Sequence, residues 1–185
     1  MSRARMMTAA AILAVVTVLF GAGCGTDATG PTETPDGWKE YTVDGFTVQW
    51  LVEDSLSSIR IKVSAPTTGW VAVGFDPTSM MTDANLLIGY VDGGTAYARD
   101  DFGTGQTTHS ADVDLGGTDN VQLLSGSEAS GTTEIDLRIP LDSGDAYDKA
   151  LVQGNTYTVI LARGADGADD FTSHHAWAEA ASLEI

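Results

Sequence analysis

Cysteine, histidine and basic residues are scarce in this chain of 185 residues, which has one Cys, three His and nine Lys or Arg. A single cysteine excludes an intramolecular disulfide framework and the clustered thiolates of a structural zinc or iron–sulfur site. The 26 Asp and Glu residues give a formal net charge of −17. Because a field of that sign repels phosphate backbones, we expect no nucleic-acid partner.

Long apolar runs are also few, and the clearest one lies near the N-terminus. Arg3 and Arg5 precede an apolar run over 9–20, and small residues lead to Cys24. This order is typical of a secretory signal peptide, and the run is short for a membrane span, which takes ~20 residues. A sole cysteine after small residues resembles the lipobox of bacterial lipoproteins. We therefore predict a signal peptide over 1–23 and an exported envelope protein, which the lipidated Cys24 anchors to the membrane. Plain secretion is the alternative.

Residues 25–37 contain Gly, Pro, Thr and acidic residues but no large apolar side chain. Such a segment cannot bury enough apolar surface to order itself. We predict a lipidated cysteine and flexible linker over 24–37, followed by one folded domain over 38–185. That length suffices for a single hydrophobic core.

From Trp38 onwards apolar residues recur at every second position, which is the period of a strand with one buried face. Clear examples are 46–50, 59–63 and 135–139, whereas 86–90 is continuously apolar, as expected near the middle of a sheet. Turns rich in Gly and Asp separate these runs. The pattern predicts an all-β fold, a two-sheet antiparallel β-sandwich of immunoglobulin-like character with about nine to eleven strands. A sandwich does not by itself indicate a function.

Signs of hydrolytic catalysis are absent from the sequence. No Gly-x-Ser-x-Gly elbow occurs, and the one cysteine lies in the export segment. The acidic pairs Asp100–Asp101 and Asp169–Asp170 are expected at the solvated surface rather than as a glycosidase pair. The loop 164–170 could hold Ca²⁺ through oxygen atoms, but it lacks EF-hand spacing, so we favour a plain acidic turn.

Two adjacent methionines and two adjacent histidines form the more informative pattern. Met80 and Met81 lie in a predicted loop, and His174 and His175 lie near the C-terminus. Thioether and imidazole together suit the axial positions of haem iron. Since neighbouring strand residues face opposite sides, one histidine should reach a given pocket; parity counted back from Ile185 favours His175 if no bulge intervenes. Packing methionines and surface or Zn²⁺- or Cu²⁺-binding histidines are the alternatives.

The order of the motifs resembles the DOMON domain family. The resemblance runs from Gly69–Phe75 through Met81–Tyr90 to a Thr-rich strand that ends at Pro140-Leu141, and then to a late His175. It covers roughly 38–185. The family implies a β-sandwich that binds haem or sugar, and its b-type cytochrome members use a loop Met and a late His as axial ligands.

Applied to this sequence, the resemblance implies a non-covalently bound haem b with Met81 and His175 as iron ligands, and Met80 and His174 as the off-by-one alternatives. The absence of Cys-x-x-Cys-His excludes covalent attachment. Asn85, where the family usually has Asp, and His109, where Pro is common, are departures from its pattern. With both axial positions filled, we expect an extracytoplasmic electron carrier rather than an enzyme, acting with a redox partner protein.

Two further functions stay open at this stage. One is a haem-free module that binds a sugar or another small molecule, in which Trp70, Tyr90 or Trp177 lines the pocket and offers a stacking face. The other is a structural domain of the cell envelope.

Overall fold

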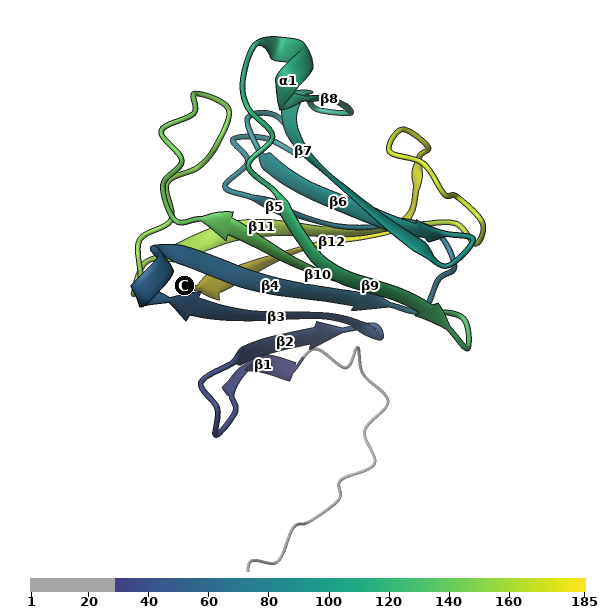
Figure 1. Cartoon of the computed structure of the whole chain (residues 1–185), viewed down its shortest axis with the longest axis horizontal. Coiled ribbons are helices and arrows are strands. Elements are labelled where there is room, and N and C mark those ends of the chain that lie inside the picture. The colour runs from purple at the N-terminus through teal and green to yellow at the C-terminus, as the bar shows by residue number, and fades with distance from the viewer. Residues whose placement is uncertain (1–28) are drawn as a thin grey trace, which may run out of the picture.

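The computed structural model describes residues 29–185, so the predicted signal peptide and Cys24 lie outside the described residues. Within that range twelve strands form two six-stranded sheets, which pack face to face as a sandwich (Figure 1). The predicted fold class is confirmed, with one strand more than the largest number expected. No helix of this part of the chain is long and apolar enough to cross a membrane.

Both sheets are antiparallel, with one short helix and one 3₁₀ turn, α1 (Asp112–Leu115) and Asp54–Leu56, in the connections. The first sheet has the order β1 (Thr29–Glu33), β2 (Lys39–Val43), β3 (Phe46–Glu53), β4 (Ser58–Ala65), β10 (Thr132–Pro140) and β9 (Gln122–Ala129). The second has the order β12 (His175–Glu184), β11 (Thr156–Gly164), β5 (Val71–Phe75), β6 (Asn85–Asp92), β7 (Thr95–Gly105) and β8 (Thr108–Ala111).

Strand β1 lies inside the segment whose composition predicts a flexible linker. It pairs with β2, with Thr32 opposite Glu40 and Glu33 opposite Lys39. Backbone hydrogen bonds to an existing sheet need no apolar side chain, and an edge strand tolerates Pro31 because one side of its backbone is not paired. The described part of the fold therefore includes a strand that precedes Trp38.

The core lies between the two sheets and consists of the alternating residues that the sequence pattern indicated. On the first sheet Ile61 pairs with Leu137, and on the second Leu161 pairs with Val73; all four side chains are buried. Strand β6 lies between β5 and β7, as expected for a continuously apolar run.

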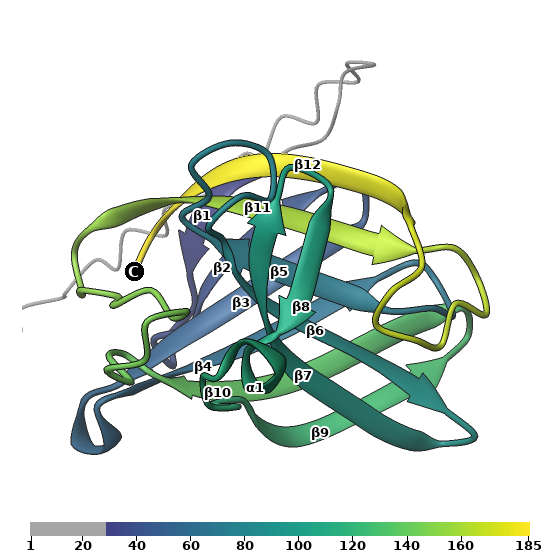
Figure 2. The same ribbon diagram turned by 90° about the horizontal axis from the view of Figure 1, so that it is seen from above.

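The second sheet also carries a smaller apolar cluster on its outer face, the face turned away from the first sheet. Trp70, Ala72 and Ile88 are buried there against Ala162 and Phe171. The loop 165–174 rises from the sheet on this side, as does β8 (Figure 1). From above, the same loop lies beside the end of β11 (Figure 2). These segments build walls on a face that a simple sandwich leaves open.

Candidate functional site: a cavity lined by methionine and histidine

A cavity of about 470 Å³ lies on the outer face of the second sheet, and we call it the outer cavity. Its volume falls in the range of small-molecule sites, ~300–1,000 Å³. Its floor is made by β11 and β12, and its walls by three loops, Trp70, β8 and the first residue of β12. The wall residues are Trp70, Met80, Met81, Gln106, Thr107, His109, Thr172, Ser173, His174 and His175. Both predicted methionines and both predicted histidines thus line one cavity.

Met81 is held in place by the backbone of β7. Its carbonyl accepts a hydrogen bond from the Ala84 N–H at 3.0 Å, and the Gly103 N–H donates to the Ala84 carbonyl at 2.9 Å. A β-carbon at Gly103 would lie 1.7 Å from the Met81 carbonyl oxygen, so only glycine allows this approach. Met80, in contrast, is 60% exposed and has a φ of 53°. The backbone of Met81 is therefore held in place, and its side chain is less exposed than that of Met80.

His175 reaches the outer cavity because of a β-bulge. The register with β11 shifts there, so that Trp177 and His175 lie opposite consecutive residues of β11. The partner of His175 is Gly164, where an added β-carbon would meet the indole of Trp70 at 2.7 Å. Since cross-strand partners share a face, His175 lies on the outer face. The parity count puts His175 on the side of Trp177 only if no bulge intervenes, and this bulge places the two side chains on opposite faces.

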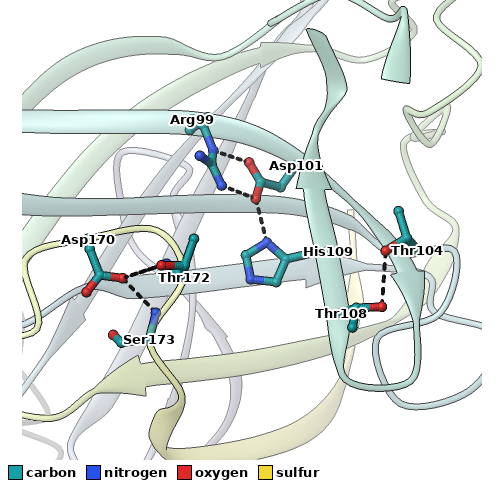
Figure 3. A network of polar contacts seen from close by, with 8 residues as sticks. All are labelled: Arg99, Asp101, Thr104, Thr108, His109, Asp170, Thr172 and Ser173. Carbon is teal, nitrogen blue, oxygen red and sulfur yellow. Dashed lines mark hydrogen bonds and ion pairs between the residues drawn. The ribbon is translucent and has the colours of Figure 1, made fainter. Parts of the chain in front are cut away.

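A third histidine, which the sequence analysis did not assign to the site, lines the same cavity. The Arg99 guanidinium donates to both oxygens of Asp101, at 2.5 and 2.6 Å, and His109 Nδ1 lies 2.5 Å from Asp101 Oδ2 (Figure 3). Burial alone would raise the pKa of Asp101, but hydrogen bonds from His109 and Arg99 and their charges lower it below 3.8. An ionised carboxylate only accepts, so the proton of this contact resides on His109 Nδ1 and the ring orientation is fixed.

The two acidic pairs differ in their surroundings. Asp100 and Asp101 are both buried, which corrects the expectation of a solvated pair. In the loop 165–174, Asp170 Oδ1 accepts the backbone N–H groups of Thr172 and Ser173, each at 2.6 Å (Figure 3). The carboxylate of Asp170 therefore stabilises a turn that forms one wall of the outer cavity.

Of the three aromatic residues predicted to line a pocket, Trp70 lines the outer cavity. Its Nε1 donates to Ser173 Oγ at 3.0 Å and so ties the loop to the sheet. Tyr90 is not among the residues that line this cavity and packs on Phe171, with ring centroids 4.9 Å apart. Trp177 faces the core instead and stacks on Phe46 at 5.4 Å. The bulge before Trp177 explains why it does not share a face with His175.

The comparison with known families is decisive for the fold. The model of the DOMON domain family matches residues 43–164. The chain belongs to the DOMON domain family. A relative at 26% identity over 117 residues is MOXD1 homolog 2 from Drosophila melanogaster; the match covers 63% of this chain and 15% of that protein. The DOMON chain therefore spans only a small part of the length of this relative.

Two solved structures share the DOMON architecture. The cytochrome domain of cellobiose dehydrogenase from Myriococcum thermophilum superposes with a TM-score of 0.58 at 12% identity, covering 87% of this chain and 89% of that one. The cytochrome b domain of pyranose dehydrogenase from Coprinopsis cinerea gives 0.55 at 17% identity, covering 75% of each chain. The fold of this DOMON domain is thus that of cytochrome b domains.

Proposed function

We propose that this DOMON domain is an extracytoplasmic electron-transfer domain that binds one haem b in the outer cavity, with Met81 and His175 as axial ligands. The observation that supports the proposal is that thioethers and imidazoles far apart in the sequence line one cavity. Haem iron takes these ligands in cytochromes, where a Met ligand raises the reduction potential. When bound, the haem would supply the chemistry by taking up and releasing one electron at iron.

The floor of the outer cavity suits a flat, largely apolar group. Ile160 of β11 lies opposite Ala180 of β12, and Ala162 lies opposite Ala178. Three of these four side chains are alanine, so this part of the floor is apolar and carries little bulk, and Glu179 of β12 adds one acidic group to the lining. At the wall, Gln106 and other polar side chains offer hydrogen-bond partners to the polar edge of a ligand.

The two proposed ligands differ from their neighbours in how firmly they are held. Met81 is fixed through its backbone contacts to Ala84 and the close approach of Gly103. His175 belongs to β12, whereas His174 precedes the strand. A protein that fills both axial positions leaves no open position for a substrate, so we propose an electron carrier rather than a catalyst.

Absorption spectra of the purified protein reconstituted with haem test the proposal. We expect sharp α and β bands in the reduced form of the wild type. The bands should be lost in Met81→Leu and in His175→Gln, and kept in the matched controls Met80→Leu and His174→Gln. A wild type without these bands, or bands that survive in both ligand variants, would overturn the proposal.

A further variant tests the identity of the ligands separately from the binding of haem. His109 lines the outer cavity, but its Nδ1 is engaged by Asp101. If His109→Gln abolished the bands and His175→Gln kept them, the ligand assignment would be wrong although haem is bound. Binding of a sugar on a glycan array by protein that takes up no haem would favour the alternative of a sugar-binding module.

We also propose that the chain is exported and that Cys24 carries a lipid anchor, which rests on the N-terminal sequence pattern. Metabolic labelling with a radioactive fatty acid tests this part separately. Wild type should be labelled and Cys24→Ser should not, and equal labelling of both would contradict the anchor.

A further inference from the structure

Three carboxylates from three separate segments converge on the other side of β7 from the outer cavity. Asp100 belongs to β7, Asp112 is the first residue of α1, and Asp148 lies in the loop between β10 and β11. One oxygen atom of each lies within 4.8 Å of the others. We call these three residues the Asp cluster.

The Asp cluster contains acceptor atoms that lack partners. Within residues 29–185, six buried side-chain nitrogen or oxygen atoms have no hydrogen-bond partner, and four of them are here: Asn85 Oδ1, Asp100 Oδ1 and both oxygens of Asp112. Asp112 is 0% and Asn85 2% exposed. Asn85 Nδ2 donates to Asp148 Oδ1 at 2.7 Å, which places the end of the Asn85 side chain at the cluster. Buried acceptors without a donor destabilise a fold unless something else satisfies them.

The cluster also lacks a countercharge. None of the ion pairs formed by residues 29–185 includes Asp100, Asp112 or Asp148. Burial, followed by the charge of Asp148, raises the pKa of Asp100 to about 8 and that of Asp112 to about 7. The neighbouring Asp101, which has Arg99 and His109 beside it, shows the opposite shift. Within residues 29–185, no basic side chain thus offsets the charge that these carboxylates carry when ionised.

The segments around the cluster are tied together without any ion. Tyr147 Oη donates to the carbonyl of Leu115 at 2.8 Å, which joins the loop to α1. The Thr118 N–H donates to Asp145 Oδ2 at 2.7 Å. Ser143 Oγ donates to Asp148 and orients its carboxylate. The oxygens are thus held in position by contacts that do not themselves need a cation.

We propose that Asp100, Asp112 and Asp148, together with Asn85 Oδ1, bind one Ca²⁺. The donor set consists of oxygen atoms alone, which suits a hard cation and not Zn²⁺ or Cu²⁺. Ca²⁺ takes ~6–8 oxygen ligands, so water completes the coordination. The site is distinct from the loop 164–170, in which Asp170 accepts backbone N–H groups instead.

Equilibrium dialysis of the EDTA-treated protein against CaCl₂ tests the proposal. We expect one Ca²⁺ per chain and a rise in the melting temperature when Ca²⁺ is added, because an ion that binds only the folded state stabilises it. Asp112→Asn should abolish both effects. Asp114→Asn is the matched control, since Asp114 is an exposed residue of the same short helix and its replacement changes the charge equally.

Melting in EDTA shows whether lost binding is merely lost folding. There Asp112→Asn should melt at or above the temperature of the wild type, because the substitution removes a buried charge that has no partner. The proposal would be overturned if the wild type bound no Ca²⁺, or if Asp112→Asn bound as much Ca²⁺ as the wild type. It would also be overturned if Asp114→Asn lost as much Ca²⁺ binding as Asp112→Asn. A lower melting temperature of Asp112→Asn in EDTA would also overturn it, because it would show that the carboxylate is structural. None of these readouts depends on haem.

Discussion

Asp100 and Asp101 are consecutive residues of β7 whose carboxylates lie on opposite faces of the second sheet. Asp101 bonds to Arg99 and His109 at the wall of the outer cavity. Asp100 lies opposite Leu87, a core residue, and belongs to the Asp cluster. Burial penalises both charges, but only Asp101 has basic neighbours, so the two pKa values move in opposite directions. One strand thereby positions two candidate sites.

Replacing Asp101 by Asn should destabilise the protein in a way that depends on pH. At about pH 7 we expect a loss of ~1–3 kcal/mol in the free energy of unfolding, because Arg99 and His109 lose a charged acceptor. The folded-state pKa of Asp101 lies below its ordinary value of 3.8. The stabilisation by the ionised form is therefore present above about pH 4 and lost as the pH falls through the folded-state pKa.

Urea unfolding of wild type and Asp101→Asn between about pH 7 and about pH 3 measures this effect. The difference between the two proteins should shrink on acidification. A difference that stays constant across this range would show that the charge of Asp101 does not contribute.

Gly103→Ala should disturb the loop that carries Met81. The new β-carbon would lie 1.7 Å from the Met81 carbonyl oxygen, so the loop must move. We expect a loss of ~1–3 kcal/mol in thermal unfolding and, if haem is bound, weakened α and β bands. Gly30→Ala is the control, because no atom lies within 4 Å of its added β-carbon. Equal melting temperatures for Gly103→Ala and Gly30→Ala would show that Gly103 does not approach the Met81 carbonyl as closely as described.

The hydrogen bond between Trp70 and Ser173 should couple the sheet to the loop 165–174. Trp70→Phe and Ser173→Ala each remove one partner of the 3.0 Å contact. Because both substitutions remove the same bond, their effects should not add. The loss in the free energy of unfolding of the double variant should be smaller, by ~1 kcal/mol, than the sum of the losses of the two single variants. Denaturant unfolding of the four proteins measures this coupling, and strictly additive losses would mean that the bond does not hold the loop.

Leu137→Ala should test the packing between the sheets. Leu137 is buried opposite Ile61, so its truncation leaves a cavity in the core. We expect a loss of ~2–5 kcal/mol. Leu56→Ala, at a side chain that is 58% exposed, should change stability by less than ~0.5 kcal/mol. Similar losses for both variants would mean that Leu137 does not pack as described.

The sandwich could be predicted from the sequence because alternation is a local signal. The pattern at 59–63 and 135–139 specifies one buried face, and these runs became β4 and β10. Strand β1 could not be predicted in this way, because it is held by backbone pairing with β2 and has no apolar alternation. The face on which His175 lies could not be derived from parity for a related reason, since the bulge beside His175 depends on the register with β11.

The candidate sites depend on contacts between distant segments. The local sequence of an acidic pair on a strand is the same whether the pair lies at the surface or in the interior. Asp100 is buried because α1 and the 141–155 loop, which are distant in the sequence, reach it. His109 could be singled out as one of three histidines, but its place in the outer cavity follows from β8 pairing with β7. The motifs therefore identified Met81 and His175 as candidates, whereas the surroundings of each residue required the structure.

The outer cavity lies outside the hydrophobic core. Its floor is formed by outward side chains such as Ile160 and Ala162, while Leu161 and Leu183 pack inward between the sheets. The chain can therefore complete its core while the cavity is empty. For the proposed haem domain, folding of the polypeptide and binding of the haem are then separate steps, which need not occur at the same time.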